Sequence, residues 1–152
     1  MKIGCVRASE IDFSKYGKFF DLNNKKGDVQ VSSGDGWTDC LIRKPVIDTP
    51  ANLGYTMGSG IPFTTKELEH HSHTQEALFC QNEPIVFLVC EVSDSPCPEA
   101  EKTQAIILYP GEVAVLNRDV WHSSAHGING PTHYFYLAYA YDGEPTEWVN
   151  IK

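Results

Sequence analysis

Residues 85–92 read Ile-Val-Phe-Leu-Val-Cys-Glu-Val, a nearly unbroken run of β-branched, aromatic and other apolar side chains. The turn-forming sequence Gln-Asn-Glu-Pro at 81–84 introduces it. A short apolar run bounded by a turn is typical of a strand buried on both faces. The residues on either side continue the pattern. Short strands are predicted over Gln104–Tyr109 and Glu112–Leu116, which are separated by Pro110-Gly111.

The C-terminal part of the chain adds two further strands to this prediction. Residues 133–141 read HYFYLAYAY, an aromatic run, and Glu147–Ile151 is predicted to return as an edge strand. Helical signals are few: a capping pattern at 9–12 predicts about two turns ending near Gly17, and the pattern at 64–67 predicts one turn at most. Many short strands with Gly and Pro between them indicate an all-β sandwich or small barrel.

Length and composition favour one folded domain spanning residues 1–152, because no linker divides the chain. The chain has 12 basic and 20 acidic side chains, a net charge of -8, and no basic run. This balance argues against nucleic acid or an anionic membrane as a partner. No apolar run is long enough to span a membrane and no secretion signal is visible, so we expect a cytoplasmic protein.

His71 and His73 stand two residues apart and are followed by Glu76. On a strand, this spacing places both imidazoles on the same face, where they can converge with Glu76 on one ion. Nitrogen and oxygen ligands with an open coordination position suit Zn²⁺, Ni²⁺, Mn²⁺ or Fe²⁺. The pair alone leaves a second interpretation open, an exposed loop pair without a ligand.

The second half of the chain contains a matching pattern. Gly111, Asn117, Asp119 and His122 follow the spacing G-x5-P-x-G-x2-H, with Asn in place of Pro and Asp in place of the second Gly. Asn and Asp both tolerate turns and left-handed backbone. This spacing resembles the second motif of the cupin family, whose first motif carries H-x-H followed by Glu. The resemblance implies a single-domain cupin: an all-β double-stranded β-helix, which is a jelly-roll-like barrel, with one or two short helices.

Three segments resemble the ureidoglycolate lyase family within the cupins. They are FSKYG at 13–17, LEHH at 68–71 with EALF at 76–79, and DVWH at 119–122. The family's segments are F-S-x-Y-G, L-E-R-H with Q-A-F, and N-V-W-H. His71 and His122 fall on matched positions. Glu76 replaces the family's Gln, His70 replaces its Arg, and His73 stands where the family has an apolar residue.

The resemblance implies a carbon–nitrogen lyase that splits ureidoglycolate into glyoxylate and urea, with nickel reported as the family's cofactor. We therefore predict a divalent transition metal (nickel, zinc, manganese or iron) held by His71, His73, Glu76 and His122. Chelation of an α-hydroxy acid would acidify its hydroxyl group. Glu76 and His122 are the predicted catalytic residues, with Glu76 moving the proton. The expected substrate is a small carboxylic acid, and the expected assembly is a homodimer.

The departures from the family pattern keep two alternatives open. One is another metal-dependent cupin reaction, an isomerisation or oxygenation of a small hydroxy acid, keto acid or sugar. The other is a non-catalytic cupin that binds a small acid. His126 is a further candidate for the site, whereas His70 is expected on the outer face. Lys44, Lys66 and Arg118 could each pair with a carboxylate, and the sequence assigns none of them.

Overall fold

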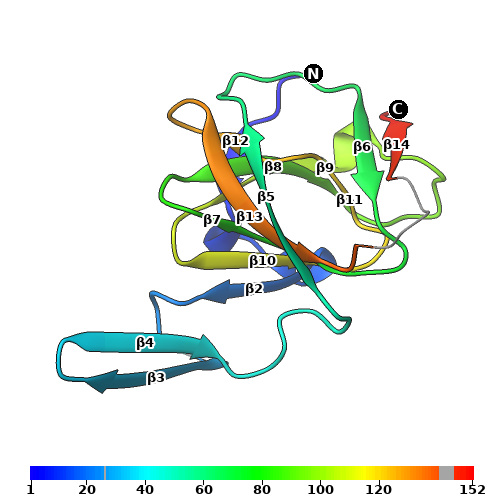
Figure 1. Ribbon diagram of the computed structural model, residues 1–152. Helices are drawn as coiled ribbons and strands as arrows, with labels where there is room; N and C mark the ends of the chain where they lie inside the picture. Colours follow the sequence, from blue (N-terminus) through cyan, green and yellow to red (C-terminus); the bar gives the residue numbers. More distant parts are fainter. Residues whose placement is uncertain (26, 141–145) are drawn as a thin grey trace.

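The predicted all-β architecture is confirmed by the computed structural model, which describes residues 1–25, 27–140 and 146–152 (Figure 1). Within these residues, strands form one seven-stranded sheet, one five-stranded sheet and a separate two-stranded hairpin. The hairpin, β3 (Val29–Gly34) and β4 (Trp37–Ile42), lies below the two sheets in the view of Figure 1.

The larger sheet has the strand order β1-β9-β8-β11-β6-β14, and β12 also pairs with β8. Its strands are β1 (Cys5–Arg7), β6 (Glu67–His70), β8 (Ile85–Cys90), β9 (Thr103–Leu108), β11 (Trp121–His122), β12 (His126–Gly127) and β14 (Glu147–Asn150). All six residues of β8 are buried, as its apolar sequence predicts. The predicted edge strand is also confirmed, since β14 ends the sheet beside β6.

The smaller sheet has the order β2-β10-β7-β13-β5 and is antiparallel throughout. Its strands are β2 (Gly17–Asp21), β5 (Asn52–Gly58), β7 (Glu76–Cys80), β10 (Glu112–Leu116) and β13 (Thr132–Ala138). The aromatic run thus forms β13. Tyr141, at the end of that run, lies outside the described residues.

The main core lies between the two sheets. Phe87 and Ile106 come from the larger sheet, Leu78 and Ala114 from the smaller one, and all four are buried in one cluster. Because side chains alternate along a strand, Leu78 shares its face of β7 with Glu76. The same alternation that fills the core therefore places an acidic side chain inside the barrel.

The two helical predictions are corrected. Residues 8–15 form two separate 3-10 turns, Ala8–Glu10 and Phe13–Lys15, instead of one two-turn helix, because Ile11 between them is extended (φ -121°, ψ 162°). The segment after Thr64 is strand β6, because pairing with β11 and β14 outweighs the weak capping pattern. No helix among the described residues is long and apolar enough to cross a membrane.

Gly17 begins β2 with φ 151°, and a Cβ atom there would lie 1.9 Å from the backbone oxygen of Val115. We expect Gly17→Ala to lower the free energy of unfolding by about 2 kcal/mol, because backbone must move to admit the methyl group. Gly4→Ala is the control, since nothing lies within 4 Å of its added Cβ. Urea unfolding measures both variants, and equal stabilities would contradict this explanation.

Candidate functional site

Four polar side chains from neighbouring strands meet inside one end of the barrel. Glu69 lies on β6, His71 follows the end of that strand, Glu76 begins β7, and His122 ends β11. Glu69 and His122 are direct partners in the antiparallel pairing of β6 with β11. Strand pairing alone therefore brings together residues that are more than 50 positions apart in the sequence.

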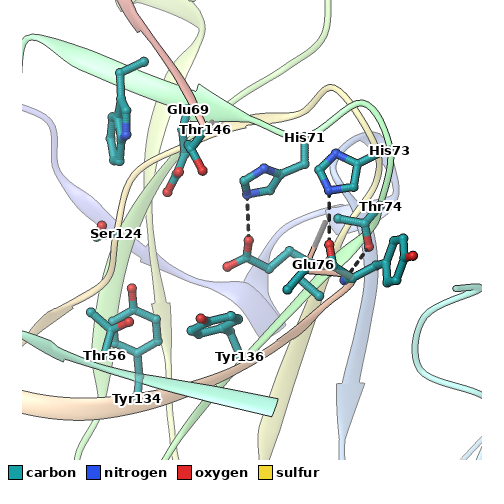
Figure 2. A pocket seen from close by; sticks show the side chains of 14 residues that line it. Thr56, Glu69, His71, His73, Thr74, Glu76, Ser124, Tyr134, Tyr136 and Thr146 are labelled. Atoms are coloured by element: carbon teal, nitrogen blue, oxygen red, sulfur yellow. Dashed lines mark hydrogen bonds and ion pairs between the residues drawn. The ribbon is translucent and has the colours of Figure 1, made fainter. Parts of the chain in front are cut away.

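The donor atoms of this cluster face one another. His71 Nε2 lies 3.0 Å from Glu76 Oε2, as drawn in Figure 2, and His122 Nε2 lies 3.5 Å from the same oxygen. Glu69 Oε1 lies 3.9 Å from His122 Nε2. One donor atom each from Glu69, His71 and His122 falls within 4.8 Å of the others. His122 thus contacts both carboxylates, and Glu76 contacts both imidazoles.

The orientation of His122 is fixed by its backbone neighbourhood. Its Nδ1 donates to the carbonyl oxygen of Val120 at 2.9 Å, which directs Nε2 into the cluster. Nε2 is buried and has no hydrogen-bond partner among the described residues. A histidine bound by its other ring nitrogen to a carbonyl is the usual arrangement of a metal ligand.

The turn before β11 ties the two sequence motifs together. Asp119 has a left-handed backbone (φ 65°), as the substitution of Gly by Asp predicts. Its N–H donates to the carbonyl oxygen of His71 at 3.0 Å. In the same turn, the Asn117 side-chain oxygen accepts from Gln75 Nε2 at 3.2 Å. These contacts fix the positions of the segments that carry His71, Glu76 and His122 relative to one another.

The pKa values of the two carboxylates in the cluster are shifted in opposite directions. Burial raises the pKa of Glu76, but the contacts with His122 and His71 outweigh burial and lower that pKa to about 2. Burial lowers the pKa of His122, and the charge of Glu76 outweighs it, so the pKa of His122 is raised overall. Burial raises the pKa of Glu69 above its usual value. Glu76 is therefore ionised at neutral pH, whereas Glu69 takes up a proton more easily than an ordinary glutamate does.

The cluster opens into a cavity of about 460 Å³. Figure 2 shows Thr56, Tyr134 and Tyr136 across the cavity from Glu69 and His71, with Ser124 at one side. Burial raises the pKa of the Tyr134 hydroxyl, which keeps it protonated as a hydrogen-bond donor. None of the described residues lining the cavity is Lys or Arg.

Of the four predicted metal ligands, the structure brings three together: His71, Glu76 and His122. His73 also lines the cavity, but its Nε2 faces the carbonyl oxygen of Tyr139 at 3.1 Å, and its ring centroid lies 6.0 Å from that of His71. The chain leaves β6 at His70, so the strand geometry assumed for His71 and His73 does not continue to His73.

Glu69 is the member of the cluster that the sequence analysis missed. It precedes His71 by two residues, so the two side chains point to the same face of an extended chain. The segment LEHH at 68–71 contains both residues. Pairing Glu69 with His71, in place of His71 with His73, lengthens the gap to Glu76 by two residues. Glu76 stands one or two residues early for a cupin glutamate when counted from His73, and this shift removes the discrepancy.

The other histidines lie outside the cluster. His126 Nδ1 is 2.9 Å from the Ser59 hydroxyl, and its ring stacks on Phe63 with centroids 3.7 Å apart. His70 packs against Trp121 with ring centroids 4.0 Å apart. His133, on β13, contacts the ring of Tyr55.

The residues present fit a divalent transition metal. The buried Nε2 of His122 has no hydrogen-bond partner among the described residues, and a metal ion would satisfy it. The imidazoles of His71 and His122 together with the carboxylate of Glu76 form a mixed N/O ligand set of the kind that binds zinc, manganese, iron or nickel. The side of the cluster that faces the cavity leaves room for a substrate.

No protein-family model and no curated protein matches the chain. Among solved structures, it resembles the WlaRB TDP-quinovose 3,4-ketoisomerase from Campylobacter jejuni, with TM-score 0.51, 9% identity, and coverage of 84% of this chain and 90% of that one. A dTDP-4-dehydrorhamnose 3,5-epimerase from Elizabethkingia anophelis gives TM-score 0.49 and 10% identity, with 76% and 69% covered. The RmlC epimerase from Mycobacterium tuberculosis gives 0.44 and 11%, with 60% of this chain and 46% of that one covered.

At these identities the comparison establishes the fold and nothing finer. The likeness to the Campylobacter protein extends over both sheets of the barrel, which 84% coverage of this chain requires. Together with the two sheets and the cluster inside the barrel, it identifies the architecture. The chain has the all-β cupin fold.

Proposed function

We propose that this protein is a metal-dependent cupin enzyme that moves a proton between adjacent carbons of a small hydroxy-carbonyl compound. The observation that carries this proposal is the cluster of Glu69, His71, Glu76 and His122 at the base of an open cavity. Such a reaction needs an anchored oxygen pair, a base next to carbon, and a donor facing the substrate oxygens. The cluster and the opposite wall supply all three.

His71, His122 and Glu76 would hold the ion, because Glu76 contacts both imidazoles at 3.0 and 3.5 Å. The bound ion would polarise the substrate's carbonyl oxygen and acidify the neighbouring C–H bond. Glu69 lies within reach of the same ion and lines the cavity, and its contact with His122, at 3.9 Å, is longer than the two contacts that Glu76 makes with the imidazoles. We therefore assign proton transfer to Glu69.

On the opposite wall, Tyr134 would donate a hydrogen bond to a substrate oxygen. Glu69 would take the proton from the carbon that bears the hydroxyl and return it to the former carbonyl carbon. The hydroxyl proton would pass to the former carbonyl oxygen, so that no atom is gained or lost. This is an isomerisation, one of the alternatives left open by the sequence, and a solved ketoisomerase has the same fold.

The ureidoglycolate lyase hypothesis is the second candidate. One observation favours it: the segments 68–71 and 119–122, which resemble that family, carry three of the four cluster residues, Glu69, His71 and His122. Release of urea and glyoxylate from ureidoglycolate by the metal-loaded protein tests it directly.

A non-catalytic cupin, the third hypothesis, would bind metal and ligand without exchanging any substrate proton. The predicted homodimer stays a prediction, and light scattering tests it.

The decisive experiment compares Glu69→Gln with Glu76→Gln, which make the same chemical change at the two carboxylates. We expect Glu69→Gln to keep its metal and lose about 100-fold or more in the exchange of a substrate carbon-bound proton for deuterium. We expect Glu76→Gln to bind metal about tenfold to 100-fold more weakly. Elemental analysis and proton NMR in D₂O measure the two effects. Full exchange activity in Glu69→Gln would overturn the assignment of the base.

A further inference from the structure

We propose that the cavity selects an uncharged, polyhydroxylated carbonyl compound, a free sugar of monosaccharide size, and rejects carboxylates and phosphate esters. This inference rests on the proposed function and names its substrate class. It departs from the carboxylic acid expected from the sequence. Three features of the cavity support it: its charge, its hydroxyl groups and its aromatic surface.

The charge of the cavity disfavours an anion. Glu69 and Glu76 bring two acidic side chains to the cavity, and a divalent ion bound there would be balanced by these two carboxylates with no positive charge left over. A carboxylate or phosphate group would then bring a negative charge without a partner into a half-enclosed space. Residues 141–145, which the structure does not describe, read YDGEP and contain no Lys or Arg. The chain's net charge of -8 acts in the same direction.

The three cations that the sequence offered for a substrate carboxylate are engaged or located elsewhere. Arg118 forms a two-point ion pair with Asp48, at 2.9 and 2.8 Å. Lys66 and Lys44 line two other hollows of the surface. In the cavity itself, the imidazole of His73 is engaged, since its Nε2 lies 3.1 Å from the carbonyl oxygen of Tyr139.

The hydroxyl groups match a sugar. Five residues that carry hydroxyl groups line the cavity: Thr56, Ser124, Tyr134, Tyr136 and Thr146 (Figure 2). A hydroxyl can donate and accept at once, so a set of them pairs with the hydroxyls of a neutral polyol without leaving a charge unmatched. The volume of about 460 Å³ suits a small ligand.

The aromatic surface completes the match. Trp148, on β14, is the strand partner of Glu69 and lines the cavity, yet it is 42% exposed. Tyr136 and Tyr139 line the cavity as well. A sugar ring has an apolar face of C–H groups that packs on an aromatic ring, while its edge of hydroxyls forms hydrogen bonds. A flat aromatic side chain beside a polar cluster offers both contacts to one molecule.

Calorimetric titration of the metal-loaded protein tests the inference with D-fructose, D-mannose and D-xylose against fructose 6-phosphate, mannose 6-phosphate and glycolate. We expect at least one free sugar to bind, and its phosphate ester to bind at least about tenfold more weakly. Tighter binding of the ester or of glycolate would overturn the inference. Binding of none of the three sugars would also overturn it. Loss of the metal site, seen by elemental analysis, would instead count against the proposed function.

A variant that adds a positive charge to the cavity tests whether the missing cation is the reason that anions bind weakly. Thr146 is exposed and lines the cavity, so Thr146→Lys adds a cation there, and Thr146→Gln is the control of similar length without charge. We expect Thr146→Lys, and not Thr146→Gln, to improve binding of the phosphate ester by about tenfold. Trp148→Ala is expected to weaken free-sugar binding by about tenfold while metal content stays unchanged. Unchanged ester binding in Thr146→Lys would contradict the charge argument.

Discussion

A His122→Ala variant is expected to bind divalent metal at least about 100-fold more weakly than the wild type and to lose the proposed activity with it. His122 is buried, and its Nε2 has no hydrogen-bond partner among the described residues, although it is aimed at both carboxylates. Its removal takes away the one imidazole that the described ion pairs connect to both carboxylates. Metal titration followed by elemental analysis measures the loss.

The matched control is His133→Ala, which removes an imidazole from β13 outside the cavity lining. We expect His133→Ala to retain one equivalent of metal. Thermal unfolding of both variants without metal separates ligand loss from misfolding, and His122→Asn, which keeps a polar group of smaller size, provides a second check. Wild-type metal affinity in a folded His122→Ala protein would refute the metal centre at this position.

The sequence predicted the C-terminal half of the barrel better than the N-terminal half. The strands β8, β9, β10, β13 and β14 carry apolar or aromatic runs, and their predicted bounds agree with the structure within a few residues. Strands β3 to β5 have mixed sequences with many exposed positions, so hydrophobicity alone does not mark them. The hairpin of β3 and β4 did carry a local signal, Asp35-Gly36, which is typical of a tight two-residue turn.

The candidate site was predicted in part because its residues come from two different kinds of signal. His71 and His122 belong to short motifs with fixed spacing, and the structure brings them together. Glu69 belongs to no histidine pattern and became visible only through its pairing with His122 across two strands. His71 follows the end of β6 at His70 directly and stays in the cluster, whereas His73 lies three residues beyond that end, where the parity argument no longer applies. Parity holds only while the strand continues, and the sequence did not reveal where β6 stops.

The second large effect concerns the core on which the site rests. Leu108, on β9, is fully buried between the two sheets, whereas Leu53, on β5, is 66% exposed. Leu108→Ala is expected to lower the free energy of unfolding by about 3 kcal/mol, because it removes buried methyl groups and leaves a cavity that a closed barrel cannot fill by collapsing. The identical change Leu53→Ala is expected to cost about 0.5 kcal/mol or less.

Urea unfolding of the metal-free protein measures both leucine variants without the contribution of a bound ion. A loss of about 3 kcal/mol is a large part of the stability of an ordinary domain, about 5–15 kcal/mol. Leu78 and Glu76 share one face of β7, so the packing that Leu108 supports also holds a buried carboxylate in the cluster. We therefore expect Leu108→Ala to weaken metal binding as well, but less than His122→Ala does. Equal stability of the two leucine variants would mean that the core between the sheets is not where this barrel is stabilised.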